Sequence, residues 1–208
     1  MATKLGLYNG ALRALGETPL VSVSESRVAR RVLDSVYDND FINKVLENGQ
    51  WNFAARASEL TYEPSITPAF GYRKAFVKPG DFIRTMAISS SEYFDPPLLQ
   101  YTDEIAYWFC ELETLYVKYV SNDASYGGNL AAWPGSFTTY AEFYLAAAAA
   151  PSINGDKLGD VVKQRERALT EAQSKDAMAE PAKFQPTGTW AGARRGNGRG
   201  YGWIGFER

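Results

Sequence analysis

The placement of proline most constrains what this chain of 208 residues can fold into. Five of its ten prolines lie between residues 51 and 126, at positions 64, 68, 79, 96 and 97. A proline in a helix interior removes a backbone hydrogen bond and costs about 3 kcal/mol. The middle of the chain is therefore predicted to form short strands and loops, and long helices are confined to the segments on either side of it.

The proline-rich middle contains five short runs with the composition of strands. These runs are Phe53–Leu60, Tyr72–Val77, Ile83–Ile88, Ile105–Cys110 and Leu115–Val120. Residues 111–114 separate the last two runs, and this spacing predicts a hairpin loop. We expect a small antiparallel β/loop region over residues 51–126.

Two helices are predicted before the β region, at about residues 3–16 and 22–48. Thr3 can cap the first of them, and Gly16 can end it. Ser22 and Glu25 have the spacing of a capping box, which predicts that the second helix begins there.

Two more helices are predicted after the β region, at about residues 136–150 and 157–178. Ser136 is a suitable N-cap for the third helix, and Pro151 is expected to end it. The sequence thus predicts a mainly α fold: a helical bundle with an inserted antiparallel β/loop segment. This body covers residues 1–184, and an extended C-terminal arm covers residues 185–208.

The absence of histidine and the single cysteine, Cys110, exclude several kinds of chemistry. A Ser-His-Asp or Cys-His nucleophile, a histidine-bearing zinc site and an intrachain disulfide are all impossible. No phosphate-binding glycine loop occurs either. We therefore expect no catalytic residue, no cofactor-binding residue and no metal ligand, and we expect that the protein is not an enzyme.

One class of enzyme survives this exclusion, because glycoside hydrolysis needs only two carboxylates. Glu111 and Glu113 could point to one face of a strand, and Asp38 and Glu142 could do so on helices. A carboxylate-based cell-wall glycan hydrolase is thus an alternative function, although paired acids on a surface are more often solvated charges.

The net charge of -2 is unevenly distributed along the chain. Residues 185–208 contain four arginines and one glutamate, so the arm carries +3 and the body carries -5. The arm also has seven glycines and four aromatic residues, a composition that excludes a helix. It suits an arm that docks on a partner protein, a loose terminus, or a segment that binds nucleic acid by charge and stacking. The residues expected to make contacts are Trp190, Arg194, Arg195, Arg199, Tyr201, Trp203 and Phe206.

No apolar run is long enough to span a membrane, and the N-terminal residues lack the apolar stretch of a signal peptide. We therefore expect a soluble protein that has no membrane partner and does not depend on an oxidising compartment.

Several short motifs, in order along the chain, together resemble one protein family. The motifs are Leu15-Gly16-Glu17-Thr18-Pro19-Leu20, Ala29-Arg30-Arg31-Val32-Leu33, Val36-Tyr37-Asp38, and Trp51-Asn52-Phe53-Ala54 with Arg56. Further along they are Tyr72 and Ala75, Pro79 with Asp81 and Arg84, Trp133-Pro134 with Phe137 and Tyr140, and Trp190 with Arg194-Arg195. This ordered set resembles the head-to-tail adaptor (head-tail connector) proteins of tailed bacteriophages, the family that includes tail tubular protein A of short-tailed phages.

The resemblance implies a structural protein of the virion neck, made in the host cytoplasm. Its partners would be the portal protein, neighbouring copies in a ring that is expected to be twelvefold, and a downstream tail or nozzle protein. Double-stranded DNA would pass through the ring without sequence-specific binding. The arm would contact the portal or a neighbouring copy. Trp51, Asn52, Phe53, Trp133 and Pro134 are expected to define the fold rather than to make contacts.

Overall fold

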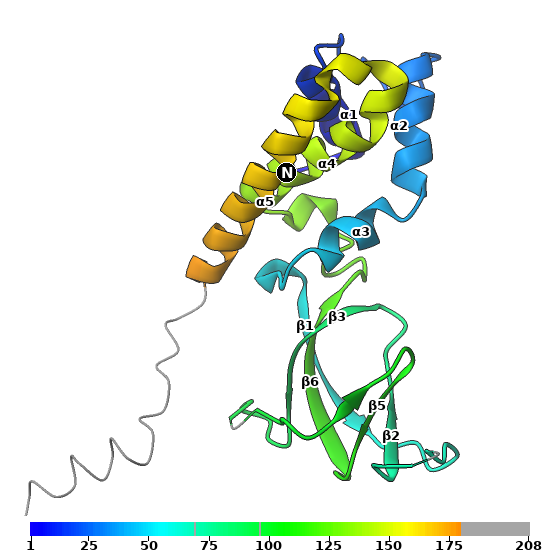
Figure 1. The fold of residues 1–208 in the computed structure, drawn as a ribbon, viewed down its shortest axis with the longest axis vertical. Helices are drawn as coiled ribbons and strands as arrows, with labels where there is room; N and C mark the ends of the chain where they lie inside the picture. Colours follow the sequence, from blue (N-terminus) through cyan, green and yellow to red (C-terminus); the bar gives the residue numbers. More distant parts are fainter. Residues whose placement is uncertain (69, 96, 180–208) are drawn as a thin grey trace, which may run out of the picture.

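A computed structural model describes residues 1–68, 70–95 and 97–179. The described chain has two parts (Figure 1). The helical module is formed by α1, α2, α3, α4 and α5, and the β-module is formed by two three-stranded sheets. The helical module lies at the upper end of the view and the β-module at the lower end.

Helix α1 (Lys4–Leu15) has the ends that the sequence predicted. The backbone N–H of Gly6 donates to Oγ1 of Thr3 over 3.1 Å, and Gly16 adopts the left-handed conformation with φ 77°. A non-glycine residue would be strained at this C-cap, so Gly16 fixes where α1 stops.

The single long helix predicted over residues 22–48 is wrong. The structure has α2 (Val28–Asp38) and α3 (Phe41–Glu47), and Asp40 between them is left-handed with φ 54°. Consecutive Asp and Asn residues at positions 38–40 favour a break, because their short polar side chains tolerate this conformation.

The predicted capping box at the start of that helix is also wrong. Glu25 instead accepts a hydrogen bond from the backbone N–H of Val21, and Ser22 Oγ accepts one from Ser24, which closes a turn. Helix α2 therefore begins three residues after Glu25, without a side-chain cap.

Helix α4 (Gly135–Ile153) is the centre of the helical module and contacts α1, α2, α3 and α5. Most of its residues are apolar, and eight of them are buried, as expected of a central helix. Ser136 lies inside the helix and does not cap it, and Pro151 lies inside its last turn instead of ending it. Helix α5 (Leu158–Ala179) covers α4 and turns Val161, Ala168 and Ala172 inward.

The strands are β1 (Ala55–Thr61), β2 (Lys74–Val77), β3 (Phe82–Ser89), β4 (Thr102–Asp103), β5 (Tyr107–Cys110) and β6 (Thr114–Ser121). One antiparallel sheet has the order β1-β6-β3 and the other has the order β2-β5-β4. The five predicted strands correspond to β1, β2, β3, β5 and β6. The two-residue β4 was missed because it carries no apolar alternation.

The hairpin predicted between β5 and β6 is wrong, since these strands lie in different sheets. Residues 111–113 carry the chain from one sheet to the other. Strand β6 pairs with β1 and β3, far apart in sequence, and strand spacing alone does not reveal such pairing.

Each module has a hydrophobic core of its own. The helical core includes Leu7, Leu12, Leu33 and Leu145, all fully buried. The β core lies between the sheets and contains Phe76, Trp108, Cys110, Leu115, Val117 and Tyr119.

The predicted fold class, a mainly α bundle with a β insertion, is therefore wrong. Over the described residues the protein is 45% helical and 19% strand, a mixed α/β fold. The reason is physical: the β region has two apolar faces that pack on each other, so it forms a second body instead of a patch on the bundle. Among the described helices, none has both the length and the apolar character needed to cross a membrane.

Candidate functional site at the junction of the two modules

The two modules meet at a junction formed by the ends of β1, β3 and β6, by α3 and by the segment from Asn48 to Ala54. Arg84 on β3 donates to the backbone carbonyl of Glu47 over 3.0 Å. At the end of β6, the amide of Asn122 donates to Asn43 Oδ1 over 2.8 Å. These polar contacts fix the β-module relative to α3.

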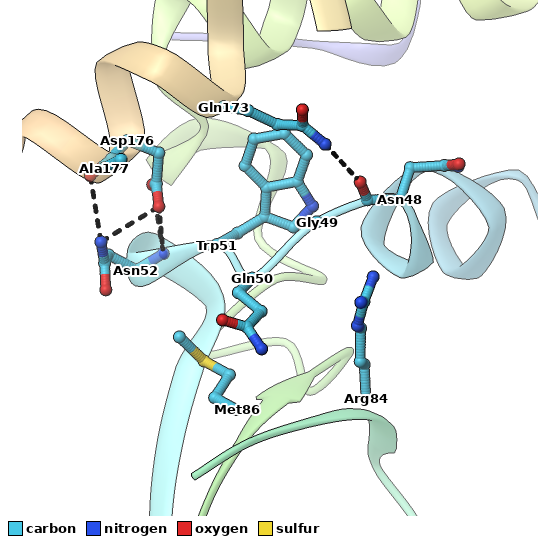
Figure 2. A pocket seen from close by; sticks show the side chains of 10 residues that line it. All are labelled: Asn48, Gly49, Gln50, Trp51, Asn52, Arg84, Met86, Gln173, Asp176 and Ala177. Carbon is cyan, nitrogen blue, oxygen red and sulfur yellow. Dashed lines mark hydrogen bonds between the residues drawn. The ribbon is translucent and has the colours of Figure 1, made fainter. Parts of the chain in front are cut away.

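The end of α5 is tied to the same junction (Figure 2). The backbone N–H of Asn52 donates to the Asp176 carboxylate over 3.1 Å, and the Asn52 amide donates to it over 3.0 Å. The same amide also donates to the Asp176 carbonyl over 3.1 Å. We call this the Asn52–Asp176 latch. One turn earlier on α5, Gln173 donates to the Asn48 carbonyl over 2.8 Å.

Aromatic residues fill the helical side of the junction. The ring centroids of Trp51, Phe53 and Trp133 lie 4.7, 4.8 and 4.8 Å from that of Phe137 on α4. The indole N–H of Trp51 donates to the Leu46 carbonyl, so its polar atom is satisfied although the side chain is buried. These edge and tilted contacts are the preferred aromatic geometries, and they orient the segment that carries Asn52.

Beside the latch lies a polar pocket of about 310 Å³. Figure 2 shows Arg84 and Asn48 on one side of it and Asn52 and Asp176 on the other. The charged groups of the lining are already engaged, Arg84 with Glu47 and Asp176 with Asn52. The rest of the lining contributes amide and apolar side chains, so this pocket pairs no nucleophile with a base.

A second polar cluster lies at the junction end of the β-module. Asp81, directly before β3, accepts hydrogen bonds from Arg56 over 2.8 Å, from Tyr119 over 3.1 Å and from Ser121. Burial acts to raise the pKa of Asp81, but these bonds outweigh it and hold the pKa below its usual value. Tyr126 lies with its ring 5.5 Å from the Arg56 guanidinium. The cluster joins β1, β3 and β6 through one ionised carboxylate.

A third cluster joins α1 to α2. Tyr8 donates to Asp34 over 2.7 Å, Arg30 pairs with the same carboxylate, and Lys4 lies 3.4 Å from it. Burial and the bond to Asp34 raise the pKa of Tyr8. The partly buried Asp34 keeps a lowered pKa because the bond from Tyr8 and the cations Lys4 and Arg30 outweigh its desolvation.

The four carboxylates that the sequence suggested as catalytic candidates contact different partners in the structure. Glu111 accepts from the backbone N–H of Arg73 over 2.9 Å, and Glu113 pairs with Lys74, so both secure the start of β2. On the helices, Asp38 pairs with Lys4, whereas Glu142 covers Gly10 of α1. Burial raises the pKa of Glu142, and Arg13 opposes this effect. Each of the four carboxylates thus has a different partner in the structure.

The predicted interface residues of the arm lie outside the described residues, as all of them follow Ala179. Of the residues expected to define the fold, Trp51, Phe53 and Trp133 meet around Phe137, Asn52 forms the latch, and Pro134 precedes α4.

Sequence reasoning missed Asp176 and Gln173, which lie near the end of α5. Their partners are 124 and 125 residues away, and no local pattern connects residues at such a separation. One local signal was present. Asn52 is an amide residue between two aromatic residues at the boundary of the β region, and a polar side chain in such a place indicates a hydrogen-bond partner from elsewhere in the chain.

Within residues 1–68, 70–95 and 97–179, no three carboxylate or cysteine side chains come together in a way that could hold a metal ion. A scan against protein-family models gave no match for the chain, and a search of curated proteins gave none either.

Proposed function

We propose that this chain is a structural head-to-tail adaptor of a tailed bacteriophage. In this role it forms a ring beneath the portal, extends the DNA channel and seats the tail. Its partners are the portal protein, neighbouring copies of itself, a downstream tail protein and the passing double-stranded DNA. The protein performs no catalysis in this role.

The observation that carries the proposal is the meeting of the ordered motif residues at the module junction. Trp51, Phe53, Trp133 and Phe137 pack together there, and Asn52 forms the latch to α5. The motif residues Arg56 and Asp81 pair at the adjoining end of the β-module. Residues from distant motifs thus serve one purpose, which is to hold two modules and α5 in fixed positions. A ring subunit under mechanical load needs this rigidity.

The position of the latch favours a mechanical role for α5. Asp176 lies three residues before Ala179, where α5 ends and the sequence runs on toward the arm. A load applied to the arm would pass through α5 to the latch and the aromatic cluster, and from there into both modules.

The charge of the chain also supports this role. A body of net charge -5 repels DNA, so DNA slides past it, whereas a basic wall would retain the polymer. The +3 arm is suited to pairing with acidic groups of a protein partner.

The test is retention of the protein on its cognate portal. A variant with Trp190, Arg194 and Arg195 replaced by alanine is expected to lose binding, because aromatic and arginine anchors contribute most to interface affinity. The matched control replaces the exposed Glu92, Asp156 and Lys175 of the body by alanine and is expected to bind normally. Normal binding by the arm variant would refute a direct contact of the arm with the portal.

A further inference from the structure

The outer face of the sheet β2-β5-β4 is apolar where a solvated face would be polar. Strand β5 reads Tyr107-Trp108-Phe109-Cys110 without a polar residue. Trp108 and Cys110 belong to the β core, so Tyr107 and Phe109 point to the other face. They pair there with Val77 and Ala75 of β2. An antiparallel sheet that is apolar on both faces indicates that the second face is covered as well.

The chain itself covers only part of this face. Phe109 is 8% exposed, and it lines a groove together with the segment before β2. Beside it, Val77 remains 47% exposed, and Phe70 and Ile105 are 92% and 99% exposed. An apolar surface of this kind marks an interaction site.

A groove of about 580 Å³ runs between the segment before β2 and the outer face of the sheet. Its aromatic lining is Phe70, Tyr72, Tyr107 and Phe109, and its charged lining is Glu104 and Glu111. No basic side chain lines it. Glu111 is engaged with the backbone of Arg73, whereas within the described residues the Glu104 carboxylate forms no hydrogen bond or ion pair. We call this the β5 groove.

The composition of the β5 groove complements one particular segment of the same chain. Residues 185–208 combine four arginines with four large aromatic residues and carry a net +3. Arginines pair with carboxylates, and aromatic side chains fill an aromatic-lined groove while arginine stacks on its rings. The volume of the groove suits one or two large side chains at a time.

The arm is also long enough to reach a second molecule. The 29 residues after Ala179 span up to about 100 Å when fully extended. In Figure 1, α5 ends on the left of the β-module, whereas β2 and β5 lie on its right. The last described residues of α5 thus lie on the side of the β-module opposite to β5, which lines the chain's own groove.

We infer that the β5 groove receives the Arg/aromatic arm, residues 185–208, of a second copy of the chain. The inference builds on the arm of the proposed function, but it names the docking surface and requires no portal. Docking of each arm on the next copy is a heterologous contact, which closes into a ring when the rotation between copies allows it.

The experiment is a cross-link between two differently labelled full-length chains. One chain carries Ile105→Cys beside the groove, and the other carries Gly198→Cys in the arm. A short bis-maleimide joins them when arm and groove meet. Cys110 does not compete, because it is 1% exposed and burial raises the pKa of its thiol. The matched control chain carries Glu92→Cys, in the exposed loop after β3.

We expect a cross-linked heterodimer with Ile105→Cys and little with Glu92→Cys. The charge-reversed Glu104→Lys in the groove chain should lower the yield about two- to fivefold, the range that an exposed ion pair supports. Combining it with Arg194→Glu and Arg195→Glu in the arm chain should restore part of the yield.

Equal yields for the two cysteine positions would overturn the inference. So would a cross-link that forms only within one chain carrying both Ile105→Cys and Gly198→Cys. Failure of portal binding with a positive cross-link would refute the adaptor role and leave the groove assignment standing.

Discussion

At the scale of single residues, Asn52 and Asp176 connect parts of the chain that are 124 positions apart. The Asp176 carboxylate accepts from both the backbone and the amide of Asn52, and that amide also reaches the Asp176 carbonyl. Removal of one partner leaves the other polar group partly buried without its hydrogen bonds, which costs about 1–3 kcal/mol.

We therefore predict that Asp176→Ala lowers the free energy of unfolding by about 1–3 kcal/mol, measured by urea denaturation. Glu171→Ala on the same helix breaks only an exposed ion pair with Lys175 and should change it by less than about 0.5 kcal/mol. A double-mutant cycle of Asn52→Ala with Asp176→Ala should show coupling. Additive effects in the cycle would contradict the latch.

Asp81 gives a pH-dependent prediction. Its pKa in the folded protein lies below the ordinary value of 3.8, so its ionised form is favoured by folding. This contribution to stability is complete above the unfolded pKa and is lost as the pH falls through the folded pKa. The acid limb of the stability curve below about pH 4 should thus be shallower in Asp81→Asn than in the wild type. An acid limb in Asp81→Asn that is as steep as in the wild type would refute this account.

At the scale of elements, Gly127 shows how tightly the junction is packed. A Cβ at this position would lie 2.5 Å from the Ser121 carbonyl oxygen, 2.8 Å from Leu46 and 2.9 Å from Ala54. Its own carbonyl also accepts the indole N–H of Trp133 over 2.8 Å. Three elements thus converge on a point where only glycine fits.

Gly127→Ala is accordingly expected to destabilise the protein by about 1–3 kcal/mol, the usual cost of overpacking. The matched substitution Gly80→Ala meets no atom within 4 Å and should change stability by less than about 0.5 kcal/mol. Thermal unfolding of both variants measures the difference. A Gly127→Ala variant as stable as Gly80→Ala would contradict the close approach of these elements.

The elements also show what sequence can and cannot predict here. The ends of α1 and five of the six strands follow from local chemistry, namely the cap at Thr3, the left-handed Gly16 and runs of strand-forming residues. The break at Asp40 was missed, because the apolar stripe continues across it although the backbone does not.

Contacts between segments far apart in the sequence could not be predicted from local sequence patterns. The pairing of β6 with β1 and β3, the two separate cores and the latch depend on contacts between distant segments. The mixed α/β fold follows from these contacts, and so does the site at the junction. Of the residues at the junction, the sequence analysis identified those of the segment from Trp51 to Phe53 and Trp133, but not their partners on α5.

At the scale of the whole molecule, two joined modules form an acidic body, and the sequence continues into a basic, aromatic arm. The junction fixes the modules and the end of α5 relative to one another. In the proposed ring, each copy would present its β5 groove to a neighbour and its acidic body to the passing DNA.

The most direct test of the adaptor role is the mass of the protein alone and after mixing with its cognate portal, measured by native mass spectrometry. We predict that mixing yields one complex in which a ring of several copies, expected to be twelve, is bound to the portal. A correctly folded protein that remains separate from the portal at every mixing ratio would contradict the account.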